Sequence, residues 1–268
     1  QSGWQNMNSA KKNGNIILDF SHIYPENIEK EIKGLSRIDL GDISGTDMYC
    51  SEEAETEIRR RLEPYGPCGI HFLDSGNYHY VTKFFTEKVT EPFSLVLYDH
   101  HSDMQTPMLP RMTSCGSWAA DVMRTNPYLT QMILTGPEQK SVDEIPQDLR
   151  EKLVCISREE VEDEKIDGKL RLIRMDLPIY ISIDKDVLDR GEARTNWNQG
   201  DMPLSILERL LLEVFEHQRV IGVDICGECS MEEPLPELME DQRINRETNE
   251  SLYRFLTRLF HTFYGERH

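Results

Sequence analysis

Short apolar runs alternate with longer helical patterns over most of the chain. Seven of these runs are continuous and rich in leucine and β-branched residues. This composition is typical of strands that are buried on both faces of a parallel sheet. We therefore predict strands at Asn15–Phe20, Gly69–Leu73, Ser94–Asp99, Thr130–Thr135, Leu153–Ser157, Ile179–Asp184 and Val220–Ile225.

The segments between these strands carry helical patterns. The two longest have apolar residues at helical spacing, and Asn245 is placed to cap the last one. Alternation of strands and helices indicates right-handed crossovers and a doubly wound α/β sheet. We predict helices at Ser51–Leu62, Tyr78–Glu87, Gly116–Arg124, Pro203–His217 and Arg246–Tyr264.

The sequence predicts one domain, because no stretch rich in Pro, Gly or Ser divides it. We assign residues 7–268 to this domain and interpret residues 1–6 as an expression remnant ahead of a native start at Met7. No run approaches the roughly 20 apolar residues that a membrane helix needs. The sequence therefore gives no reason to expect a membrane partner.

The formal net charge of −18 argues against a nucleic-acid partner, whose phosphates would be repelled. An acidic protein is compatible with a cationic substrate, although we assign most of the excess charge to solvated helix faces such as Glu159–Ile166. The chain has six cysteines, at positions 50, 68, 115, 155, 226 and 229. They suggest buried, reduced thiols in a cytoplasmic protein. Cys226 and Cys229 form a lone CxxC, which lacks the further ligands of a structural zinc site, and a redox role stays open.

The strongest chemical signal follows the strand predicted at Ser94–Asp99. Asp99, His101 and Asp103 share parity, so they project to one side if the chain stays extended. His100 has the opposite parity and is expected to point away. Carboxylates that converge in this way repel one another unless a cation lies between them. An exposed polar loop is the alternative interpretation.

Similar groups follow other predicted strands. Asp184 and Asp186 end the strand Ile179–Asp184, and His79 follows a turn after the strand Gly69–Leu73. Alone, each could be a turn or helix-start residue. In a doubly wound sheet, however, ligands bind beyond the carboxyl ends of the strands. Together these oxygen and nitrogen donors indicate a site for manganese or a similar divalent cation.

The order of these motifs resembles the ureohydrolase family of arginase, agmatinase and formiminoglutamase. The similarity spans roughly Gly69 to Cys229 and ends with the acids Asp224 and Glu228. The resemblance implies a three-layer α/β/α sandwich with a central, mainly parallel sheet (an arginase-like fold). It also implies a homo-oligomer and a site that binds two Mn²⁺. The metal ligands implied are His79, Asp99, His101, Asp103, Asp184 and Asp186.

The resemblance further implies hydrolysis of a linear C–N bond in a guanidino, amidino or formimino small molecule. A metal-bridging hydroxide would be the nucleophile, and Asp103 would pass its proton to the leaving amine. Glu228 would act in catalysis and bind a cationic group of the substrate. Gln105 replaces a polar residue that helps to hold the substrate in arginases.

Several positions depart from the family pattern. Cys115-Gly116 stands where many members have His-Gly, Asp189 is not followed by proline, and one extra residue separates Asp224 from Glu228. Two alternatives therefore stay open. One is a non-catalytic or divergent metal-binding member of the fold. The other is a deacetylase-like amidohydrolase, although such enzymes usually carry a histidine pair and a catalytic tyrosine at one zinc.

Overall fold

The computed structural model describes residues 12, 14–161 and 167–265. The segment 1–6, and most of the acidic stretch predicted at Glu159–Ile166, lie outside the described residues. Within them, no helix is long and apolar enough to cross a membrane.

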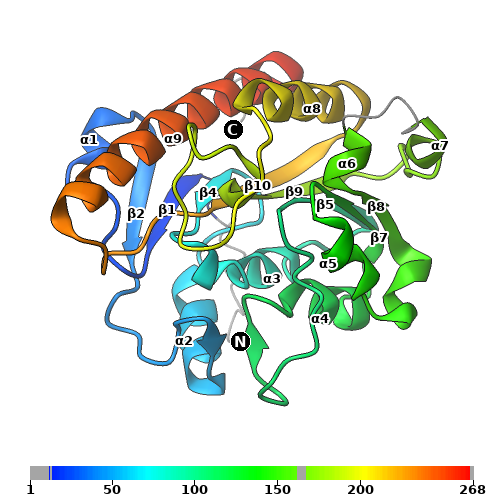
Figure 1. The fold of residues 1–268 in the computed structure, drawn as a ribbon, viewed down its shortest axis with the longest axis horizontal. Coiled ribbons are helices and arrows are strands. Elements are labelled where there is room, and N and C mark those ends of the chain that lie inside the picture. The colour runs from blue at the N-terminus through cyan, green and yellow to red at the C-terminus, as the bar shows by residue number, and fades with distance from the viewer. Residues whose placement is uncertain (1–11, 13, 162–166, 266–268) are drawn as a thin grey trace, which may run out of the picture.

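A parallel eight-stranded sheet forms the centre of the described chain (Figure 1). The seven predicted strands are confirmed, with ends that shift by at most one residue. The eighth strand was missed because its side chains are mostly partly or fully exposed, as expected for a sheet edge rather than a continuous apolar run. In sheet order, the strands are β2 (Leu35–Asp39), β1 (Asn15–Asp19), β4 (Ile70–Phe72), β10 (Val220–Cys226), β9 (Ile179–Asp184), β5 (Phe93–Tyr98), β7 (Leu129–Thr135) and β8 (Leu153–Ile156).

Helices cover both faces of this sheet, which confirms the three-layer α/β/α sandwich. Figure 1 shows α8 (Leu204–His217) and α9 (Leu235–Tyr264) along one face and α2 (Glu52–Leu62), α3 (Val81–Thr86) and α4 (Trp118–Thr125) on the other. Successive strand residues pack into opposite cores: Tyr180 faces one and Ile181 the other. The remaining elements are α1 (Ile28–Glu31), β3 (Tyr49–Cys50), η1 (Gly76–Tyr78), β6 (Thr113–Ser114), α5 (Gln139–Asp143), η2 (Gln147–Lys152), α6 (Arg158–Val161), α7 (Asp167–Leu170) and η4 (Lys185–Val187).

The last helix begins earlier than predicted. It starts at Leu235, eleven residues before Arg246, and Pro234 is its N-cap. The prediction that Asn245 caps this helix is therefore wrong. Asn245 lies inside the helix, where its Oδ1 accepts a hydrogen bond from Arg194 N (2.8 Å) and its Nδ2 donates one to Arg194 O (2.7 Å). A polar residue in this pattern predicts a helix start, but here it ties the helix to a loop.

Four central strands set the position of any site. β4, β10, β9 and β5 are consecutive neighbours in the sheet, and all run parallel. Their carboxyl ends therefore meet at one edge, although their residue numbers run from 70 to 226. The residues that follow these strands are the ones that carried the chemical signals.

We expect Asn245→Ala to lower the free energy of unfolding by about 1–3 kcal/mol, because it leaves both backbone groups of Arg194 without their partner. Chemical denaturation would measure the change. Glu247→Ala is the matched control, since the Glu247 side chain on the same helix is 66% exposed and its ion pair with Arg243 is superficial. Equal stability losses in the two variants would contradict the role of Asn245.

Candidate metal centre

All six predicted metal ligands come together at the carboxyl edge of the central strands. His79, Asp99 and Asp103 form one group whose ligand atoms lie within 4.8 Å of one another, and Asp99, His101 and Asp186 form a second. Asp99 belongs to both groups. Asp184 adjoins the first group, since its Oδ2 lies 3.6 Å from His79 Nδ1.

Asp99, His101 and Asp103 meet because the chain turns after β5. The three residues do converge, but the predicted reason, shared parity in an extended chain, is wrong. β5 ends at Tyr98, and Asp103 has a left-handed backbone with φ +51°. His101 N donates to Asp99 Oδ1 at 2.6 Å, which closes the turn. His100 points away as predicted, and its Nε2 lies 2.8 Å from Glu138 Oε1.

The ring of His79 is held with one nitrogen towards the carboxylates of the cluster. Its Nε2 is hydrogen-bonded to Ser182 Oγ at 2.8 Å, which leaves Nδ1 facing the carboxylates. Nδ1 lies 2.9 Å from Asp103 Oδ2 and 3.3 Å from Asp99 Oδ2, yet it forms no properly directed hydrogen bond. Asp99 Oδ2 is likewise buried without a hydrogen bond. Buried polar atoms that face one another in this way fit a cation between them, and the donors suit a divalent one.

The second group opens towards solvent at His101. Its Nδ1 lies 2.8 Å from Asp186 Oδ2 and 3.5 Å from Asp99 Oδ1, and its side chain is 27% exposed. The Trp197 ring is 6.0 Å from the His101 ring. Gly76 lies between Trp197 and Asp184, because a Cβ there would come within 2.9 Å of Trp197 Cδ1 and 3.1 Å of Asp184 Oδ2. Trp197 therefore forms a wall beside the exposed side of the cluster.

The charges of the cluster perturb one another strongly. Burial, followed by the charges of Asp186 and Asp99, raises the pKa of Asp184 to about 7. Burial and the charge of Asp99 raise the pKa of Asp186 to about 6. Burial opposes a charge on His101, but its hydrogen bonds with Asp186 and Asp99 outweigh that effect and raise its pKa to about 12. In the metal-free protein, protons on Asp184 and Asp186 reduce the repulsion among the crowded carboxylates. A divalent cation could reduce the same repulsion.

Comparisons with known proteins agree with this arrangement. The family model described as "Arginase family" matches residues 22–230. The chain belongs to the arginase family. An uncharacterized protein of Thermotoga maritima is 30% identical over 235 residues, which cover 85% of each chain.

Solved structures of other members share the fold. Proclavaminate amidino hydrolase from Streptomyces clavuligerus superposes with a TM-score of 0.65 at 15% identity, covering 91% of this chain and 92% of that one. Entamoeba histolytica arginase, solved with L-ornithine, gives 0.62 at 14% identity, covering 93% and 99%. Trypanosoma cruzi formiminoglutamase with two Mn²⁺ gives 0.60 at 12% identity, covering 92% and 94%.

Two residues with predicted substrate roles lie outside the cluster. Glu228 is buried, and its Oε1 accepts hydrogen bonds from Lys185 Nζ and Asn249 Nδ2, each at 2.6 Å. Lys185 lies between the predicted ligands Asp184 and Asp186 in sequence and is fully buried. A carboxylate that is already paired with an internal cation is poorly placed to bind a cationic substrate. Gln105 is exposed, next to Gly116.

Several further residues shape this arginase-family site without having been predicted. Trp118 Nε1 donates to Asp103 Oδ2 at 2.6 Å, and Ser182 holds His79. Trp197, beside His101, and Lys185, paired with Glu228, are two further residues of the site that were not predicted. A tryptophan at a helix start and a serine inside a strand look like ordinary core residues in sequence. Only the Ser-x-Asp spacing of Ser182 and Asp184 could have pointed to Ser182.

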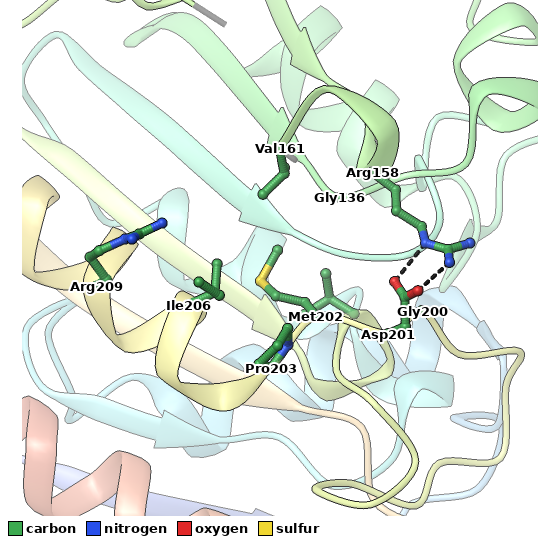
Figure 2. A pocket seen from close by; sticks show the side chains of 10 residues that line it. Gly136, Arg158, Val161, Gly200, Asp201, Met202, Pro203, Ile206 and Arg209 are labelled. Atoms are coloured by element: carbon green, nitrogen blue, oxygen red, sulfur yellow. Dashed lines mark hydrogen bonds and ion pairs between the residues drawn. The ribbon is translucent and has the colours of Figure 1, made fainter. Parts of the chain in front are cut away.

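A separate cavity of about 410 Å³ lies nearby and contains none of the six predicted ligands. Figure 2 shows Arg158, paired with Asp201, at one end and Arg209 at the other, with Val161, Met202 and Ile206 between them. The cavity therefore does not mark the metal centre.

We expect the metal-free protein to lose stability as the pH rises from about 4 to about 7. Asp184 and Asp186 have pKa values of about 7 and about 6 in the fold against an ordinary 3.8, so the folded chain holds extra protons in this range. The stability that these two carboxyl groups contribute is complete below their ordinary pKa of 3.8. It is lost as the pH rises through their raised pKa values. With Mn²⁺ present the trend should reverse, because metal binding needs deprotonated carboxylates.

Thermal unfolding midpoints between pH 4 and pH 8, with chelator and with Mn²⁺, would measure both trends. The doubly substituted variant Asp184→Asn/Asp186→Asn should show a flatter profile. A metal-free midpoint that rises across the range would contradict the expectation.

Proposed function

We propose that this arginase-family protein is a metal-dependent hydrolase of linear C–N bonds in a guanidino, amidino or formimino small molecule. The observation that carries the proposal is that two groups of candidate ligands converge and share Asp99. The first group adds His79 and Asp103, and the second adds His101 and Asp186. Two bound divalent cations, Mn²⁺ or a related ion, would supply acidified water as nucleophile near neutral pH. The relatives named amidino hydrolase and formiminoglutamase suggest the class of bond.

The ligands divide between two positions. His79 and Asp103 would hold one ion and His101 and Asp186 would hold the other, while Asp99 belongs to both groups of candidate ligands. Asp184 also lies between the positions, since its carboxylate contacts His79 and accepts a hydrogen bond from Asp186 N at 2.9 Å. The four aspartates offset two divalent cations in charge.

Asp103 is the residue that we propose moves the proton. Its Oδ2 is held by Trp118 Nε1, whereas its Oδ1 makes no hydrogen bond to the part of the chain that the structure describes. Oδ1 can therefore accept a proton from the attacking water and deliver it to the leaving amine. Trp118 fixes the carboxylate while this happens.

Trp197 supplies a flat surface beside the opening at His101. Its Nε1 donates to Asn77 Oδ1 at 2.9 Å, so the ring is held at that position. A planar guanidinium or amidinium can stack on an indole, which also favours a positive charge. This stacking surface supports a small, cationic substrate whose positive charge is met by Trp197 and not by Glu228.

Metal analysis and turnover together test the proposal. We expect close to two divalent ions per chain after loading with Mn²⁺, with release of urea, ammonia or formamide from one compound of a guanidine, amidine and formimino panel. Two bound ions without turnover on the panel would favour the non-catalytic alternative. The replacement of the family's His-Gly by Cys115-Gly116 is consistent with that alternative. A folded chain that binds no divalent metal would sink the proposal.

We expect Asp186→Asn to remove most metal at one position and to lower activity at least about a hundredfold, since a ligand matters more than its outer-shell partners. Metal content and kcat/KM would be measured together. Asp189→Asn is the matched control: Asp189 is an exposed acid three residues further on, and its Oδ1 only accepts from Gly191 N. Similar losses in both variants would contradict the assignment of Asp186.

Glu228→Gln should chiefly lower stability, because it leaves Lys185 buried without its charge partner. The thermal midpoint should fall clearly, and the KM ratio between cationic and neutral substrates should stay within about threefold of wild type. A strong, selective rise in KM for cationic substrates would instead restore the sequence-based role of Glu228. Gln105 keeps its predicted substrate contact as part of the proposal.

The cellular setting is part of the same proposal. We expect a cytoplasmic homo-oligomer that acts on a small molecule and has no nucleic-acid or membrane partner. The six cysteines are free in the structure, which supports a reducing compartment.

A further inference from the structure

Cys226 lies at the candidate metal centre, although its CxxC context did not connect it with the predicted metal ligands. It is 1% exposed, and its Sγ is 3.3 Å from Asp184 Oδ2. The ligand atoms of His79, Asp184 and Cys226 all lie within 4.8 Å of one another. The thiol therefore faces the same point as two of the predicted metal ligands.

The backbone fixes the thiol in this place. Cys226 is the last residue of β10 and pairs in register with Asp184, the last residue of β9. Gly227 then has φ +98°, and a Cβ there would lie 2.7 Å from Asp184 Oδ1. The chain thus passes tightly against Asp184, with glycine required at the turn. This packing leaves the Sγ beside the carboxylate.

A second observation marks this point as a cation position. His79 Nδ1 and Asp99 Oδ2 are buried without hydrogen bonds, while the other ring nitrogen of His79 is held by Ser182. A cysteine that served packing alone would account for neither atom. A cation shared by the carboxylates, the imidazole and the thiol accounts for both.

We propose that Cys226 binds, as a thiolate, the ion that His79 and Asp184 hold, and that it makes this position prefer Zn²⁺ or another thiophilic ion to Mn²⁺. This rests on the proposed metal centre. On binding, the S–H bond breaks, the sulfur keeps the electron pair and the proton passes to solvent. Sulfur and oxygen atoms 3.3 Å apart can share one ion, because Zn–S and Zn–O distances are about 2.3 Å and about 2.0–2.2 Å. Thiolates select soft or borderline ions, whereas manganese prefers oxygen.

Cobalt substitution tests the proposal directly. The metal-free wild type, Cys226→Ser and Cys229→Ser would each be loaded with Co²⁺. Cys229 is an equally buried cysteine that belongs to none of the ligand groups of the described chain, so it is the matched control. We expect visible d–d bands in all three proteins. We expect near-ultraviolet sulfur-to-cobalt charge transfer in the wild type and in Cys229→Ser, and its loss in Cys226→Ser.

The outcomes separate this inference from the proposed function. Visible bands without charge transfer in the wild type, or charge transfer that survives in Cys226→Ser, would overturn the cysteine ligand and leave the metal centre standing. A folded wild type without cobalt bands would overturn both. Competition between Zn²⁺ and Mn²⁺ gives a second readout, in which Cys226→Ser should lose at least about tenfold of the zinc preference.

A measurement on the wild type alone covers the case in which Cys226→Ser does not fold. X-ray absorption at the zinc edge should show a sulfur neighbour at about 2.3 Å for one of the two zinc ions in the fully loaded protein, which is about half a sulfur per zinc on average. A first shell of only oxygen and nitrogen would overturn the proposal.

Discussion

Repulsion among buried carboxylates is the constraint on which the rest of this structure depends. Four adjacent parallel strands end at one edge, and the chain places Asp99, Asp103, Asp184 and Asp186 there beside two histidines. Without a cation, burial and mutual repulsion raise the pKa of Asp184 and of Asp186. The surrounding fold must hold these groups together against that repulsion. Strands buried on both faces, with helices packed over them, supply the required rigidity.

The contacts around the cluster show how that rigidity is achieved. Ser182 fixes the ring of His79, and Trp118 fixes the carboxylate of Asp103. Lys185 directs its ammonium group to Glu228 and Asn249 rather than to the neighbouring aspartates. A lysine between two predicted metal ligands in sequence would otherwise compete with a cation for their charge. The buried pair with Glu228 therefore keeps the centre acidic.

Much of this could be predicted from sequence, because parallel strands buried on both faces leave continuous apolar runs. Motif order and residue type were sufficient to bring His79 and Asp186 into one site. The edge strand β2 was missed because the half-exposed Leu35–Asp39 lacks such a run. The partner of Glu228 could not be foreseen either, since Lys185 and Asn249 are 64 residues apart and meet only through packing. The same holds for Cys226, whose neighbour Asp184 is set by strand register.

The long helix α9 also has a consequence for how the protein matures. It is the last element of the described chain, and it reaches back to the site twice: Asn249 bonds Lys185 and Glu228, and Asn245 holds the loop at Arg194. During synthesis, the strands that carry the aspartates leave the ribosome well before these two asparagines. The acidic edge thus lacks these supports until both asparagines have been made. Any ion bound at this edge would therefore meet its complete protein surroundings only after α9 has been made.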